Sequence, residues 1–275
     1  MKATCPLRDG GRLSYRVIGD AATGTPILLL RPFAGSMALW GAFQGRLARE
    51  CPVVAFDPRG VGDSSPCPLG ITTRSMAGDA LSLLDHLGIP RAHVFGLSIG
   101  GMVASWLAID HADRIDHLVL ASTLPRWGTI SWHGARTALS LLACFRHPGY
   151  ALESCMTGKI LSSGFRLAHP DRVARIERAI RAHPARKRDM ALLFLAAARH
   201  GVARGEFPKR VPTLLLVGEH DPIVGAGSQK ELLLDVPDAR LEIVPDSGHD
   251  LTLEQPIVTA ELVLEFVRER EAVSP

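Results

Sequence analysis

Ser98 lies between two glycines, in the stretch Val-Phe-Gly-Leu-Ser-Ile-Gly-Gly that covers residues 94–101. A strand-like apolar run precedes it and an apolar helical pattern follows it. A serine on such a sharp turn has a strained backbone, and glycine is needed two positions to either side because a side chain there would collide with the strand or the helix. The first N–H groups of the helix can then stabilise an oxyanion. The stretch therefore predicts a nucleophile elbow with Ser98 as the nucleophile.

A serine nucleophile needs a base and an orienting acid, and both follow in the order Ser, Asp, His. Asp221 and His249 each come in the loop after a strand-like run, so both loops would open at the edge of the sheet where Ser98 lies. We expect His249 to take the serine proton and Asp221 to hold the imidazole in the required tautomer. Asp246 is a rival acid, but it lies only three residues before His249, so we prefer Asp221.

The elements that must position these residues alternate along the chain. Helix-like patterns cover residues 75–87 and 256–270, and most of the later strand-like runs are continuously apolar, as parallel strands covered on both faces should be. The predicted strands are 13–17, 27–30, 53–56, 92–95, 118–121, 213–217 and 241–244. The order of elements therefore predicts an α/β fold.

Two further motifs accompany the elbow. Residues 57–65 read Asp-Pro-Arg-Gly-Val-Gly-Asp-Ser-Ser, and Gly248-His249 is followed by Glu254-Gln255-Pro256. With these motifs the chain resembles the α/β-hydrolase superfamily over nearly all its length, and most of all its capped esterases, enol-lactonases and cofactor-free haloperoxidase-like enzymes. The resemblance implies an α/β-hydrolase fold with a mostly parallel central sheet, helices on both faces and an inserted helical cap. It implies neither a cofactor nor a metal.

The resemblance also implies an oxyanion hole made by the backbone N–H groups of Phe33 and Ile99. The chain departs from the family here, because Arg31-Pro32 stands where the family usually has His-Gly. Pro32 has no N–H to donate, but the expected donor is the next residue, Phe33. Arg31 could bind a carboxylate of the substrate or pair with an Asp or Glu nearby.

Strand-like runs disappear between residues 125 and 212, and helical patterns replace them. We expect residues 125–212 to form the cap and residues 1–124 and 213–275 to form the core. In this fold the cap shapes the substrate pocket. Side chains of the cap that could line the pocket, or instead pack within the cap, are Trp127, Trp132, Phe145, Phe165, Met190, Phe194 and Leu195.

Positive charge is concentrated in the same region. Residues 126–210 hold 16 Lys or Arg against 5 Asp or Glu, whereas the rest of the chain holds 15 against 23. The arginines of residues 172–188 could form a solvated face, or they could attract an anionic substrate or an acidic carrier protein. Neither a stacking-aromatic nor a groove-helix motif accompanies the charge, so nucleic acid is not an expected partner.

Composition limits the class of protein. A chain of 275 residues with 47% hydrophobic residues can bury one large core. Neither a secretory apolar region nor an apolar run of bilayer length is present, so we expect a cytoplasmic protein that does not enter a membrane. The five scattered cysteines predict reduced thiols rather than a disulfide framework, and no CxxC or His-x-x-x-His metal pattern occurs.

Together these features predict a serine hydrolase that cleaves a small-molecule carboxylic ester or lactone through an acyl-enzyme. A hydrolase of the carbon–carbon bond in a β-diketone, an acyltransferase and a perhydrolase would use the same three side chains. A ligand receptor on the same fold is the non-enzymatic alternative, which need not retain all three. Dehalogenases and epoxide hydrolases are disfavoured, because by resemblance those branches carry Asp where this chain has Ser98.

Overall fold

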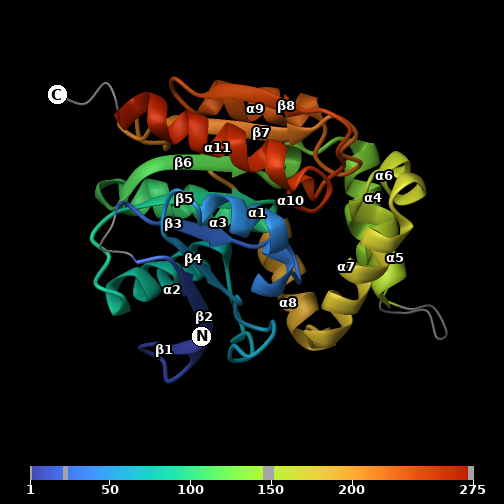
Figure 1. The fold of residues 1–275 in the computed structure, drawn as a ribbon, viewed down its shortest axis with the longest axis horizontal. Coiled ribbons are helices and arrows are strands. Elements are labelled where there is room, and N and C mark those ends of the chain that lie inside the picture. Colours follow the sequence, from blue (N-terminus) through green and yellow to red (C-terminus); the bar gives the residue numbers. More distant parts are fainter. Residues whose placement is uncertain (1, 21–23, 145–151, 272–275) are drawn as a thin grey trace.

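The computed structural model describes residues 2–20, 24–144 and 152–271, and a central eight-stranded sheet organises them (Figure 1). The strand order is β1-β2-β4-β3-β5-β6-β7-β8. β1 and β2 run antiparallel to their neighbours, and the strands from β4 and β3 to β8 pair in parallel. The strands are β1 (Ala3–Pro6), β2 (Arg12–Ile18), β3 (Ile27–Leu30), β4 (Val53–Phe56), β5 (Ala92–Leu97), β6 (Ile115–Ala121), β7 (Thr213–Gly218) and β8 (Arg240–Val244).

Helices cover both faces of this sheet. Alternate residues of a strand point to opposite faces, so Leu28 and Leu30 of β3 join one apolar cluster and Ile27 and Leu29 join the other. The first cluster contains side chains of α2 (Thr73–His86), α3 (Ile99–Asp110) and α9 (Ala226–Asp235). The second contains side chains of α1 (Gly41–Leu47) and α11 (Pro256–Glu271). The predicted α/β fold is confirmed.

All seven strands predicted from the sequence are present, with ends that differ by a few residues. β1 is not among the strands predicted from the sequence. In this strand Cys5 is buried whereas its three companions are exposed, so no apolar run marks it. β1 pairs with β2 at the edge of the sheet, far in the strand order from β5, which leads to Ser98.

The chain between β6 and β7 is helical, and in Figure 1 helices α4 to α7 lie beyond the end of the sheet to which β6 points. Leu39, of the short helix η2 (Met37–Trp40), packs with Leu161, Phe165 and Ile176, so this helical segment also contacts the core of the protein. Its elements are η4 (Trp127–Thr129), α4 (Trp132–Ala143), α5 (Leu152–Ile160), α6 (Ser163–Ala168), α7 (Pro170–Ala182) and α8 (Lys187–Ala198). The remaining short helices are η3 (Ala112–Arg114) and α10 (Leu251–Glu254).

A disulfide joins Cys144, just after α4, to Cys155 in α5. The expectation that all five cysteines are reduced is therefore wrong for this pair. Their sequence separation of 11 matches no disulfide motif, and the bond becomes possible because α4 and α5 pack together. Cys5 and Cys67 carry free thiols. Among the helices that the structure describes, none is long and apolar enough to cross a membrane.

Candidate active site

Ser98 occupies the sharp turn between β5 and α3. Its backbone has φ 57° and ψ −120°, a conformation that L-residues rarely adopt. Two contacts with the neighbouring chain hold it there: its N–H donates to the carbonyl oxygen of Ala121 at 2.8 Å, and the Thr123 hydroxyl donates to its carbonyl oxygen at 2.8 Å. The strain is thus maintained by the end of β6, and the serine side chain is presented at the edge of the sheet.

The glycines around Ser98 are required by close backbone contacts. A Cβ atom at Gly96 would collide with the backbone of Gly100, and one at Gly100 would collide with the backbone of Leu30. Backbone cannot rotate away as the end of a flexible side chain can. The packing of β3, β5 and α3 therefore explains why the predicted spacing of glycines occurs.

Replacing Gly100 with Ala is expected to lower the free energy of unfolding by about 1–3 kcal/mol, because the added methyl group overpacks the elbow. Gly78 is the matched control: it lies on the exposed side of α2 with nothing within 4 Å of an added Cβ. There the same change should stabilise the protein by about 0.5–1 kcal/mol, because alanine favours the helix. Urea unfolding of both variants measures the difference, and equal effects would contradict the proposed collision.

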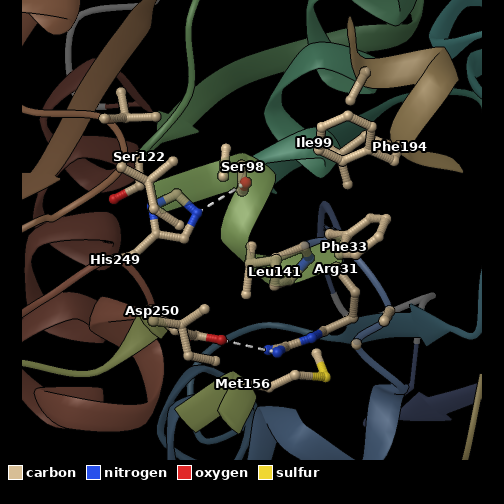
Figure 2. A pocket seen from close by; sticks show the side chains of 18 of the residues that line it. Arg31, Phe33, Ser98, Ile99, Ser122, Leu141, Met156, Phe194, His249 and Asp250 are labelled. Carbon is tan, nitrogen blue, oxygen red and sulfur yellow. Dashed lines mark hydrogen bonds and ion pairs between the residues drawn. The ribbon is translucent and has the colours of Figure 1, made fainter. Parts of the chain in front are cut away.

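Ser98, His249 and Asp221 form a continuous hydrogen-bonded chain. The Ser98 Oγ lies 2.9 Å from His249 Nε2 (Figure 2), and His249 Nδ1 lies 3.0 Å from both oxygens of Asp221. A carboxylate can only accept, so Nδ1 carries the imidazole proton and Nε2 accepts from the serine hydroxyl. The Asp221 carboxylate also accepts from the N–H groups of Ile223 and Val224. The acid is thereby fixed by the loop after β7.

The environment of His249 favours its protonated form. Burial by itself lowers the pKa of this imidazole, but the charge of Asp221 and its hydrogen bond raise it, with smaller contributions from Asp250 and Glu254. The net result is a pKa above the ordinary value of 6.5. The arrangement can therefore accept a proton from Ser98 and stabilise the imidazolium that results.

Asp246, the rival acid, lies away from this chain of hydrogen bonds. It is exposed, and its N–H donates to the Glu219 carboxylate. Its carboxylate groups with Glu219 and His220, all three exposed, with ligand-type atoms within 4.8 Å of one another. Asp221, and not Asp246, is therefore the carboxylate that orients His249 in this structure.

A pocket opens at Ser98 and is lined by core and helical segment together (Figure 2). A water-sized molecule can occupy about 80 Å³ of this pocket. Its walls are predominantly apolar. The apolar lining residues are Pro32, Phe33, Ala34, Leu39, Ile99, Met102, Leu124, Trp127, Ile130, Ala138, Leu141, Met156, Ile160, Ile180, Phe194, Ala197, Ile223, Val224 and Leu253.

The aromatic candidates take different places. Trp127 and Phe194 line the pocket, and Phe194 meets the rings of Trp127 and Phe33 edge-on at centroid distances of 5.7 Å and 6.3 Å. Trp132 does not line it: this side chain is 78% exposed, about 120° around α4 from the lining residue Ala138. Phe165 and Met190 are buried outside the pocket lining, Leu195 is exposed, and Phe145 lies outside the described residues.

Phe33 and Ile99, the expected oxyanion donors, both line the pocket that opens at Ser98 (Figure 2). Ile99 is the first residue of α3, so its N–H has no acceptor within that helix. Phe33 lies in a turn closed by a hydrogen bond from the Gly35 N–H to the Pro32 carbonyl oxygen at 2.9 Å. Arg31, at the start of this turn, pairs with Asp250 at 2.9 Å.

Glu254, in the motif that contains His249, is a residue of the site that was not predicted from the sequence. Its buried carboxylate accepts from the N–H of Gly248 at 2.8 Å and from the hydroxyl of Ser162 at 2.6 Å. The His249 N–H in turn donates to the carbonyl oxygen of Ile160. Burial raises the pKa of Glu254, and the hydrogen bonds oppose that rise. Glu254 thus ties the histidine loop to the helical segment, a role its place in the motif could have indicated.

Part of the arginine series contacts other parts of the protein. Arg172 donates to the carbonyl oxygen of Leu253 and stacks on Phe165, and Arg181 pairs with Glu153 at 2.9 Å. These arginines therefore contribute to packing of the helical segment as well as to its charge.

Comparison with known proteins agrees with this architecture. Residues 25–256 match the family model described as alpha/beta hydrolase fold. A poly(3-hydroxyalkanoate) depolymerase of Ectopseudomonas oleovorans is 26% identical over 91% of this chain and 88% of its own length. The 3-oxoadipate enol-lactonase 2 of Acinetobacter baylyi is 26% identical over 89% of this chain and 88% of its own. A thermophilic esterase of Thermogutta terrifontis is 26% identical and superposes with a TM-score of 0.83, covering 98% of both chains. The chain therefore belongs to the α/β hydrolase fold family, and the relatives named here are hydrolases.

Proposed function

We propose that the protein is a serine hydrolase that cleaves a carboxylic ester or lactone through an acyl-enzyme. The observation that carries this proposal is the hydrogen-bonded chain from Ser98 through His249 to Asp221 at the mouth of an apolar pocket. A receptor needs a pocket, but it does not need a strained serine hydrogen-bonded to an oriented histidine.

In this proposal Ser98 Oγ attacks the carbonyl carbon while His249 Nε2 takes the serine proton. Asp221 keeps the imidazole oriented and stabilises its charge. The N–H groups of Phe33 and Ile99 hold the negative charge that develops on the carbonyl oxygen. The protonated His249 then donates its proton to the leaving oxygen, and a water activated by the same imidazole releases the acyl group from Ser98.

The pocket favours a substrate with an apolar acyl group. The cap, residues 125–212, supplies much of the apolar wall through α4, α5 and α8, and the polar side chains of the lining are those of Arg31, Ser98, Ser122, His249 and Asp250. Burying an apolar chain contributes about 0.8 kcal/mol per CH₂. The named relatives include an enol-lactonase, a poly(3-hydroxyalkanoate) depolymerase and an esterase, which supports ester or lactone chemistry.

Rapid mixing with p-nitrophenyl esters of increasing acyl length tests the proposal. We expect a burst of nitrophenol equal to one equivalent of enzyme, and we expect kcat/KM to increase with acyl length until the pocket is filled. A fluorophosphonate should add one phosphonyl group, located on Ser98 by peptide mass spectrometry. Absence of both the burst and the adduct would refute the proposal. Transfer of the acyl group to an added alcohol in preference to water would assign an acyltransferase instead.

The pH dependence of kcat/KM should show one ionisation, with activity increasing as pH increases. Neutral imidazole is the base, so protonated His249 is inactive. Because the pKa of His249 is raised, the midpoint should lie above the ordinary value of 6.5. Rates with a neutral aryl ester across the pH range measure it. A midpoint below that value would show that burial of His249 outweighs the charge of Asp221.

A further inference from the structure

Arg31 and Asp250 form an ion pair buried beside the pocket (Figure 2). One Nη atom of Arg31 lies 2.9 Å from the Asp250 carboxylate, and both side chains are 1% exposed. The guanidinium stacks on the ring of Trp40, with its central carbon 4.3 Å from the ring centroid. Arg31 comes two residues before Phe33, and Asp250 comes directly after His249. The pair therefore connects the loop after β3 with the loop after β8.

This pair is a poor source of stability. Removing two charges from water costs several kcal/mol per ion, and their attraction offsets this cost only where the remaining donors are also paired. Nε and the other Nη atom of Arg31 lack a hydrogen-bond partner among the described residues. Apolar side chains of similar size would fill the space at lower cost. The arrangement therefore needs an explanation other than stability.

The turn that carries Phe33 is shaped around the guanidinium of Arg31. A Cβ atom at Gly35 would lie only 2.7 Å from Arg31 Nε. The turn can therefore pass this close to the guanidinium only because residue 35 is glycine. Ala34, between Phe33 and Gly35, has a φ of 58°, in the left-handed region that L-residues rarely adopt. Displacement of the Arg31 side chain would therefore displace the turn, and with it the N–H of Phe33.

Several charged groups surround the two loops. Asp221 faces His249 from the loop after β7, and Asp250 and Glu254 face it from its own loop and α10. Arg31 meets Asp250 directly and is also within the influence of Asp57, after β4. Arg172 of α7 donates to carbonyl oxygens of α10. Among these carboxylates, Asp250 is the one that pairs with Arg31. The positive charge of Arg31 therefore offsets the negative charge of Asp250, which lies next to His249 in the sequence.

We propose that Arg31 and Asp250 are positioning residues: their ion pair holds the Phe33 turn at a fixed separation from His249 and neutralises the carboxylate beside that imidazole. The inference rests on the proposed function, because it concerns the alignment of oxyanion donor and base. Neither residue touches the reacting atoms. Their effect is transmitted through Phe33 and His249.

The test compares Arg31→Gln with Asp250→Asn. Arg31→Gln should lower kcat for an aryl ester by about 10- to 100-fold, the effect of misplacing a reacting group by about 1 Å, with little change in KM. It leaves the Asp250 charge unbalanced, so the pKa of His249 and the midpoint of the pH profile should increase. Asp250→Asn leaves Arg31 unbalanced, so the midpoint should decrease. Shifts of opposite sign are the signature of the pair.

Arg74 provides the matched control. Arg74 pairs with Asp110 at 2.6 Å and stacks on Trp106 at 4.7 Å, just as Arg31 pairs with Asp250 and stacks on Trp40. Unlike Arg31, however, Arg74 is exposed and does not line the pocket. Arg74→Gln should leave both kcat and the midpoint unchanged. Arg31→Lys retains the charge, so it should keep the midpoint near that of the unaltered protein and recover part of kcat.

Two results would overturn the inference. The first is an unchanged kcat in Arg31→Gln, whether KM stays the same or increases. The second is a pair of pH midpoints, in Arg31→Gln and Asp250→Asn, that do not shift or that shift in the same direction. An increased KM with an unchanged kcat is a special case of the first result, and it would make Arg31 a substrate-binding group. If Arg31→Gln does not fold, the downward shift in Asp250→Asn and the recovery by Arg31→Lys decide the question. Fluorophosphonate labelling of Ser98 in the unaltered protein tests the proposed function separately, so the two failures are distinguishable.

Discussion

Replacing Ser98 with Ala is expected to lower kcat for an aryl ester by about six powers of ten, because no other group can form the acyl-enzyme. The fold should survive. The change removes one hydroxyl whose hydrogen bond to His249 contributes about 1 kcal/mol to the free energy of unfolding. Steady-state rates and urea unfolding on the same preparation measure the two effects. His249→Ala should reduce kcat by a similar factor.

Ser105 is the matched control for this change. Ser105 is a buried serine of α3, the helix that follows Ser98, and its hydroxyl donates to the Gly101 carbonyl oxygen within the same helix. Ser105→Ala should therefore change stability slightly and leave kcat unaltered. Undiminished turnover in Ser98→Ala, with Ser105→Ala equally active, would exclude Ser98 as the nucleophile.

The second largest effect is expected for Asp221→Asn, which should lower kcat by about four powers of ten. Asparagine fills the same space, but its amide can donate to Nδ1 and so favours the wrong tautomer of His249. Asp246→Asn is the control, because this exposed carboxylate faces Glu219 and His220 rather than the imidazole. Steady-state rates of both variants at the pH optimum measure the effect. A larger loss in Asp246→Asn would reverse the assignment.

The sheet could be predicted from the sequence because its strands are local features. β3, β5 and β7 are short apolar runs that end in turn residues, and parallel strands need little else to be recognised. The order Ser98, Asp221, His249 could be predicted for the same reason: each residue follows such a run, and parallel strands bring their carboxyl ends to one edge. In the structure His249 lies within hydrogen-bond distance of both Ser98 and Asp221.

The pocket wall could not be predicted in the same way. Helical periodicity identifies an apolar face, but it does not show whether that face points to the pocket, to the core or to solvent. Trp132 therefore fits the pattern of a pocket residue although it faces solvent in the structure. The disulfide between Cys144 and Cys155 depends on how α4 meets α5, which no local pattern encodes. The partner of Arg31 is 219 residues away in the chain, so the alternatives for this side chain remained open until both loops could be placed.

The attachment of the histidine loop to the helical segment limits how this scaffold can be remodelled. The helices between β6 and β7 supply about half of the apolar lining residues, and they could be exchanged for others while β5, β7 and β8 stay in place. Ile160 and Ser162 limit such an exchange, because they hold His249 and Glu254 through backbone and side-chain hydrogen bonds. A transplanted insertion that changed specificity would have to retain these two anchor points. A change of pocket on this scaffold is therefore coupled, through Ile160 and Ser162, to the position of His249.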